Sequence, residues 1–183
     1  GGSCFPKDVK ALIRTAEDNG YGMKIISAVE EVNKEQKKVV FKKLYEALGH
    51  NLKDRTVAIW GLAFKPCTDD MREAPSIVTI SLLIEAGAHV RVFDPAAMNT
   101  AKAIFGDSVT YCTDIYDAAE GADAAALITE WKQFRIPDWK RLLKVMKGNI
   151  IVDGRNIYNP QEVQAAGIDY YCIGCPHEAM RKR

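Results

Sequence analysis

The sequence predicts an α/β protein: a doubly wound, Rossmann-like parallel sheet preceded by a helical segment with one long helix. From residue 53 onward, short apolar runs alternate with amphipathic helical patterns, as in chains of βα units. Before residue 50 the apolar residues recur three and four positions apart, which indicates helices alone. We therefore expect residues 1–50 to end a helical domain and residues 51–183 to form a ligand-binding domain.

Two helices are expected in the first segment. One covers residues 8–19, after Pro6, and ends at Asn19-Gly20. The other covers residues 22–48 and ends at Gly49; at 1.5 Å per residue it would be about 40 Å long. Such a helix exceeds what a small core needs, so we expect it to connect domains or to form a dimer, with a coiled coil as the alternative.

The second segment is expected to contain six strands. Thr56–Gly61 is an unbroken apolar run ending in glycine, typical of a buried parallel strand. The expected strands cover residues 56–61, 89–93, 109–112, 124–128, 150–152 and 170–173, and the expected helices residues 74–86, 98–105, 115–119 and 139–146.

Composition narrows the function classes. Lys and Arg number 25 against 24 Asp and Glu, which gives no bulk attraction to nucleic acid or to an anionic membrane. We find neither an apolar run long enough to cross a bilayer nor a signal-like leader, and five scattered cysteines favour a reducing, cytoplasmic compartment. Cys172, Cys175 and His177 lack a fourth ligand, so we expect no metal site.

Three expected strand ends carry cations, carboxylates and aromatic residues: residues 63–73, 129–131 and 153–156. Carboxyl ends of parallel strands meet at one edge, where ligands bind, and these residue types suit a nucleoside diphosphate. Arg155 is the sharpest candidate, because a guanidinium beyond a buried strand needs an anion, either Asp153 or a ligand phosphate. Lys65 and Arg72 are candidates too, with solvated loop cations as the alternative.

The turn after the first strand does not match a dinucleotide site. Of the glycines in a G-x-G-x-x-G fingerprint only Gly61 is present, so a pyrophosphate cannot approach the backbone closely. Asp94 stands where such a site has its ribose-binding acid, but we favour a strand-ending turn with Pro95.

Cys4 is the candidate nucleophile. A thiol just ahead of a helix, with Lys7 nearby, has two reasons for a lowered pKa, and Asp8 is placed to position a water or a lysine. The alternative is a structural cysteine.

Four stretches of the sequence together resemble the UDP-glucose 6-dehydrogenases of the UDP-glucose/GDP-mannose dehydrogenase family. They are Gly1–Asp8, Gly61–Pro66 with Thr68–Glu73, Ile128–Trp131 and Asp153–Asn156. The resemblance covers the C-terminal half of that family only. It implies that the family's N-terminal NAD-binding domain is missing and that this chain alone is inactive.

The resemblance implies a double oxidation of UDP-glucose to UDP-glucuronate with NAD as cofactor. Cys4 matches the cysteine that captures the aldehyde as a thiohemiacetal and then forms a thioester, and Asp8 matches a residue that activates the hydrolytic water. Phe64 and Lys65 match contacts to the uridine and diphosphate, and Arg155 matches a substrate-binding arginine.

The remaining implied roles concern the cofactor, the sugar and the dimer. Gly1 lies in the loop that shapes the sugar site, Arg72 matches an arginine that reaches NAD, and residues 4–7, Cys4 and Lys7 among them, lie along the cofactor. The long helix matches the core of a homodimer. The alternatives are a GDP-mannose or UDP-N-acetylmannosamine dehydrogenase, or a nucleotide-sugar-binding and dimerisation module without turnover.

Overall fold

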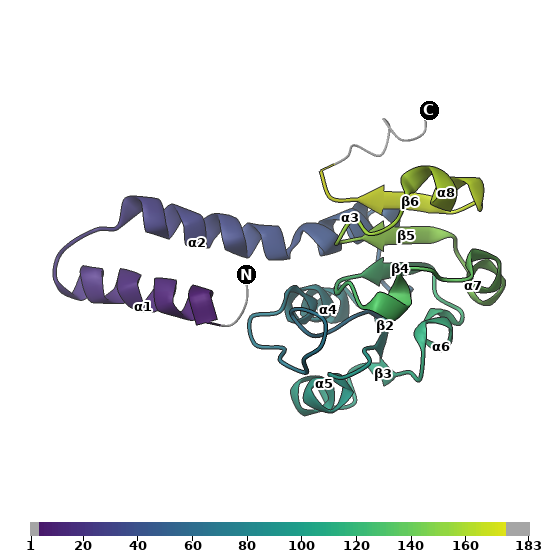
Figure 1. Cartoon of the computed structure of the whole chain (residues 1–183), viewed down its shortest axis with the longest axis horizontal. Helices are drawn as coiled ribbons and strands as arrows, with labels where there is room; N and C mark the ends of the chain where they lie inside the picture. Colours follow the sequence, from purple (N-terminus) through teal and green to yellow (C-terminus); the bar gives the residue numbers. More distant parts are fainter. Residues whose placement is uncertain (1–3, 175–183) are drawn as a thin grey trace.

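The computed structural model describes residues 4–174, with Cys4 described by its backbone alone. A six-stranded sheet with strand order β3-β2-β1-β4-β5-β6 forms the body of the molecule, and every neighbouring pair is parallel (Figure 1). The strands are β1 (Thr56–Trp60), β2 (His89–Phe93), β3 (Thr110–Tyr111), β4 (Ala124–Leu127), β5 (Ile150–Asp153) and β6 (Asp169–Cys172). The predicted doubly wound fold is confirmed, and its strand order reverses between β1 and β4.

Helices cover both faces of the sheet because successive strand residues point to opposite faces. Val57 and Ile59 of β1 belong to one core, and Ala58 and Trp60 belong to the other. The first core is closed by α3 (Val39–Ala47), α4 (Pro75–Glu85) and α5 (Met98–Phe105), and the second by α6 (Ile115–Ala119), α7 (Trp139–Val145) and α8 (Pro160–Ala165). Among the described residues, no helix has the length and apolar character that crossing a membrane requires.

The expected long helix is divided in two. The structure has α2 (Lys24–Lys37) and α3, separated by Lys38, whose backbone stays right-handed at φ −88° and ψ −8°. The prediction of one helix over residues 22–48 is thus corrected. The division falls at the end of a run of polar residues, 33–38. β-branched Val39 then begins the helix that packs on the sheet.

The first helix also differs from expectation. α1 (Cys4–Asp18) begins four residues earlier than predicted and includes Pro6 in its first turn, where no intrahelical N–H bond is lost. α1 and α2 pack as a hairpin that projects from the body, while α3 contacts β4, β5 and α4 (Figure 1).

Sequence reasoning missed two short elements, a 3₁₀ turn η1 (Lys132–Phe134) and helix α8. Both signals for α8 are present in the sequence: the side chain of Asn159 accepts a hydrogen bond from the backbone of Gln161, and Pro160 occupies the first helical position.

Gly61 lies at a crowded point of the carboxyl edge of the sheet. Its φ of +86° is left-handed, and a Cβ there would lie 2.5 Å from Cβ and 2.6 Å from the backbone N of Thr129. Because a backbone atom blocks the space, the neighbour cannot move aside. The close contact lets the loops after β1 and β4 meet.

We predict that Gly61→Ala lowers the free energy of unfolding by at least about 3 kcal/mol, from steric overlap added to a strained φ. Gly49→Ala is the matched control: Gly49 is also left-handed, at φ +73°, but a Cβ added there would meet no atom within 4 Å. It should lose only about 1 kcal/mol. Urea unfolding of both variants checks this, and equal losses would contradict it.

Candidate functional site

A cavity of about 370 Å³ lies where α2 and α3 pass over the carboxyl edge of the sheet. The strand side supplies residues from the loops after β1, β4 and β5, and the helix side supplies polar residues of α2. Its walls include Phe64, Ile128, Gly154, Arg155 and Asn156 on the strand side and Asn33, Gln36, Lys37 and Val40 on the helix side. Its volume is in the range of small-molecule sites.

Asp94 organises the neighbouring part of this edge. Its side chain is buried, and Oδ2 accepts hydrogen bonds from the backbone of Leu62 (2.6 Å) and Ala63 (3.2 Å) and from Nε1 of Trp131 (2.9 Å). Oδ1 accepts from the backbone of Ala96 and Ala97. The carboxylate therefore ties together the ends of β1, β2 and β4, and Asp94 ends a strand as the sequence suggests.

Arg155 spans the cavity wall between two loops. Nε donates to the carbonyl of Ile128 (2.6 Å), and Nη2 donates to the carbonyl of Phe64 (3.1 Å). Nη1 has no protein acceptor within the described part of the chain. The guanidinium is thus fixed by neutral carbonyls and keeps one edge for an anion.

The anionic partner of Arg155 is Glu130, not Asp153. Oε2 of Glu130 lies 3.0 Å from Nε, but the Nε hydrogen is used by Ile128, so the contact is an ion pair without a hydrogen bond. Of the two anions that the sequence offered for Arg155, Asp153 does not pair with the guanidinium, and a ligand phosphate stays a prediction. Buried Asp153 instead accepts from the backbone of Arg155 and from the hydroxyl of Tyr170.

The loop after β1 places Phe64 and Lys65 differently. Phe64 is half-buried, packs on the core and lines the cavity. Lys65 is exposed, with Nζ 5.3 Å from the centre of the Phe64 ring. The structure thus brings together Phe64 and Arg155, and Lys65 lies beside them on the solvent side of the ring.

The other candidates lie on α1 or beside it. Lys7 and Asp8 are exposed on α1, with Nζ and Oδ1 3.6 Å apart. The Arg72 side chain is 77% exposed and makes a two-point contact with Asp70 (Nε–Oδ1 3.0 Å, Nη2–Oδ2 2.8 Å). Cys4 is the first residue of α1, and Gly1 lies outside the described residues, as do Cys175 and His177.

A charged cluster joins α1 to the loop of Arg72. The carboxylate of Glu73 accepts from Nζ of Lys10 (2.7 Å) and Nζ of Lys37 (2.6 Å), and Lys10 also lies 3.6 Å from buried Glu30. The hydrogen bonds from Lys10 and Lys37 lower the pKa of Glu73 to about 2, and the bond to Glu73 raises the pKa of Lys10. Lys37 and Glu73 line the cavity together.

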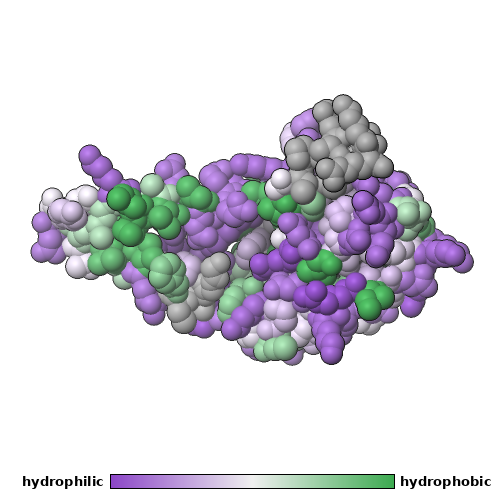
Figure 2. Space-filling view, turned by 45° about the horizontal axis from the view of Figure 1, so that its top comes forward, coloured by the Kyte–Doolittle hydropathy of each residue, from purple (hydrophilic) through white to green (hydrophobic). Residues whose placement is uncertain are grey.

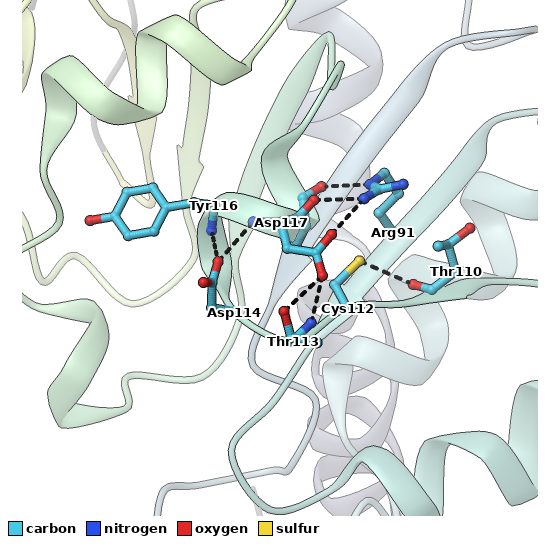
Figure 3. Close-up of polar contacts among 8 residues, drawn as sticks. Arg91, Thr110, Cys112, Thr113, Asp114, Tyr116 and Asp117 are labelled. Atoms are coloured by element: carbon cyan, nitrogen blue, oxygen red, sulfur yellow. Dashed lines mark hydrogen bonds and ion pairs between the residues drawn. The ribbon is translucent and has the colours of Figure 1, made fainter.

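A second polar cluster lies beside β2 and β3 (Figure 3). Asp117 accepts from the backbone and hydroxyl of Thr113 and from Nη2 of Arg91, and Asp114 caps α6. Burial raises the pKa of the Cys112 thiol to about 11, so this sulfur stays protonated. The cluster fastens α6 to β2 and offers no nucleophile.

Sequence reasoning placed Glu130 at the ligand edge without pairing it with Arg155, and it missed the helix wall of the cavity. Glu130 is the second residue after the expected strand 124–128, and that position is the signal for a residue at the edge. Asn33, Gln36 and Lys37 belong to a run of polar residues, 33–38, that interrupts the apolar pattern of the expected helix. Nothing in that run indicates that α2 passes over the strand ends.

Comparisons with known proteins agree with this architecture. Residues 58–160 match the model for the UDP-glucose/GDP-mannose dehydrogenase family, UDP binding domain, and residues 1–35 match the central domain of the same family. The UDP-binding match covers all of the sheet except the first residues of β1 and the whole of β6, and it includes Phe64 and Arg155.

The chain is 48% identical to UDP-glucose 6-dehydrogenase of Pseudomonas aeruginosa, over 96% of this chain and 40% of that protein. It is 43% identical to UDP-glucose 6-dehydrogenase TuaD of Bacillus subtilis, over 96% and 38%. A solved UDP-glucose dehydrogenase from Pyrobaculum islandicum superposes with a TM-score of 0.79 at 40% identity, over 93% and 37%. The chain therefore spans about 40% of the length of the curated relatives it matches.

Proposed function

The chain belongs to the UDP-glucose/GDP-mannose dehydrogenase family, and on that premise we propose that it supplies the UDP-sugar-binding part of an NAD-dependent UDP-glucose 6-dehydrogenase. The observation that carries the proposal is the cavity at the carboxyl edge, where an aromatic ring and a partly unused guanidinium meet. The match of residues 58–160 to the UDP binding domain of the family supports the same ligand.

The cavity offers chemistry for each part of a nucleoside diphosphate. Phe64 presents a ring against which a base or ribose can pack, and Arg155 presents Nη1 to a phosphate oxygen. Lys65 adds a second cation beside the ring. Asn33 and Gln36, one helical turn apart, present amides that both donate and accept hydrogen bonds.

In the proposed reaction, the C6 alcohol would first lose a hydride and its hydroxyl proton to become an aldehyde. The thiolate of Cys4 then adds to that carbon, and the carbonyl oxygen takes up a proton to give a thiohemiacetal. Loss of hydride from that carbon and of the hydroxyl proton leaves a thioester, which water hydrolyses to the carboxylate and the free thiol. Asp8, one turn along α1 from Cys4, is proposed to accept a proton from the attacking water. NAD, when bound, accepts the two hydrides.

The residues of this sheet do not fit the pyrophosphate of a dinucleotide. Asp94 already fills the turn after β1, where its carboxylate takes the backbone N–H groups of Leu62 and Ala63. A second anion there would meet like charge. We propose that Lys7 and Arg72 contact the cofactor from outside the sheet, since both are exposed: Lys7 lies on α1, and Arg72 precedes Glu73, which binds Lys10 of α1.

We also propose that the α1–α2 hairpin forms a homodimer. Ile25, Val29 and Val32 recur on one face of α2 and are 78%, 50% and 69% exposed. Figure 2 shows apolar surface gathered over the projecting hairpin. A second copy of the chain, related by a two-fold axis, would cover this surface with the same residues.

Titration calorimetry with UDP, UDP-glucose and GDP-mannose tests the ligand. We expect UDP ligands to bind and GDP-mannose to bind more weakly. Arg155→Ala should weaken UDP binding about tenfold or more, because a hydrogen bond to a charged group is lost. Lys65→Ala should have a smaller effect, and exposed Lys140→Ala none. Unchanged affinity in Arg155→Ala, or preference for GDP-mannose, contradicts the proposal.

We predict that the 183-residue chain with UDP-glucose and NAD produces no NADH absorbance, because Asp94 occupies the dinucleotide turn of its sheet. The same sample must bind UDP by calorimetry, which shows that it is folded. Steady NADH formation by the chain alone would refute this prediction.

The dimer is tested by sedimentation velocity. The unmodified chain should sediment as a dimer, and the double variant Ile25→Lys, Val32→Lys as a monomer, because two buried charges would face their own copies. Ile104→Lys, at an exposed apolar position on α5, is the control and should stay dimeric. A monomeric unmodified chain at all concentrations would exclude the hairpin dimer.

A further inference from the structure

We propose that Glu73 is a positioning residue, whose carboxylate fastens the hairpin that bears Cys4 and Asp8 to the loop that carries the nucleotide cavity. This inference rests on the proposed function of the cavity and of Cys4. It concerns how α1, with Cys4 and Asp8, is held in a fixed position relative to the cavity.

The contacts of Glu73 join three separate elements. Oε1 receives Lys10 from α1 at 2.7 Å, and Oε2 receives Lys37 from α2 at 2.6 Å, while Glu73 itself lies in the loop between β1 and α4. Each carboxylate oxygen therefore holds a different helix. The side chain of Lys37 is only 13% exposed, and Lys10 has a second partner in buried Glu30, so the cluster is charge-balanced and partly shielded from solvent.

The backbone at Glu73 is constrained as well. Its φ is +59°, in the left-handed region that side-chain-bearing residues rarely occupy. Just before it, Asp70 accepts from the backbone and guanidinium of Arg72, and the backbone N–H of Ala74 donates to the carbonyl of Met71. The loop is thus rigid on both sides of Glu73, which is what a fixed anchor for two helices requires.

The geometry connects this anchor to both parts of the proposed site. Lys10 lies on α1 less than two turns from Cys4 and within one turn of Asp8. Lys37 and Glu73 line the cavity that also contains Phe64 and Arg155. Release of Lys10 would let α1 shift against the cavity without removing any group that is proposed to bind the nucleotide.

Glu35 provides a matched control. Its carboxylate also takes two lysines, Lys38 at 2.6 Å and Lys42 at 2.8 Å, and those lysines lower its pKa to about 2. All three residues lie along the α2–α3 connection, so the two ion pairs of Glu35 join α2 to α3 and neither of them joins α1 to the loop after β1. Glu35→Gln therefore also removes a carboxylate that binds two lysines, but it leaves the link between α1, α2 and the loop after β1 in place.

The first test is hydrogen exchange of the amides of α1 in the 183-residue chain. Glu73→Gln should raise their exchange about fivefold or more, Lys10→Gln should do the same, and the double variant should add little, since both variants remove the shared ion pair between Lys10 and Glu73. Glu35→Gln should stay within about twofold of the unmodified chain. Unchanged exchange in Glu73→Gln, or an equal rise in Glu35→Gln, overturns the proposal.

The second test separates positioning from binding. UDP-glucose should slow alkylation of Cys4 by iodoacetamide, followed by mass spectrometry, in the unmodified chain and in Glu35→Gln. In Glu73→Gln and in Lys10→Gln this protection should be lost. In Lys10→Gln, whose side chain does not line the cavity, the dissociation constant for UDP should stay within about threefold. A Glu73→Gln variant that keeps the protection contradicts the proposal. If the unmodified chain binds no UDP, the proposed function fails, and the exchange measurement still decides the role of Glu73.

Discussion

One buried carboxylate sets the shape of the ligand-binding edge. The Asp94 carboxylate accepts hydrogen bonds from N–H groups in the loops after β1, β2 and β4. These hydrogen bonds replace the hydration that a buried charge loses. Because the fold of a dinucleotide-binding domain places a ligand's pyrophosphate at this turn, an internal anion here changes what the edge can bind. The same Rossmann-like strand order thus serves a different ligand position.

The cavity lies on the β5 side of this turn, and α2 and α3 form its other wall. Arg155 crosses from β5 to the loops after β1 and β4, and its two carbonyl contacts hold those loops at a fixed distance. Gly154 belongs to the same arrangement, since Val40 of α3 comes close to the space where its side chain would lie. The helical segment is therefore part of the cavity rather than only a connection to it.

Much of this was readable from the chain. Short apolar runs and the residues that end them predicted the six strands, most of the helices and the edge where Phe64 and Arg155 meet, because parallel strands that are buried on both faces are apolar throughout. The division of the helix at Lys38 and the partnership of Glu130 with Arg155 were not readable, since both depend on tertiary contacts between distant residues. The ion pairs of Glu73 belong to the same class, because Lys10 lies 63 positions away in the sequence.

The division at Lys38 separates the projecting hairpin of α1 and α2 from α3. α3 is held in the body, so α2 extends from a pivot for about 20 Å at 1.5 Å per residue, and a rotation of about 10° carries its far end through about 4 Å. α1 runs back antiparallel, which returns its first turn to the body and near the pivot (Figure 1). Contacts between the distal apolar tip and a neighbouring molecule would therefore act far from this pivot, whereas Lys10 and Lys37, which Glu73 binds, hold the two helices to the body.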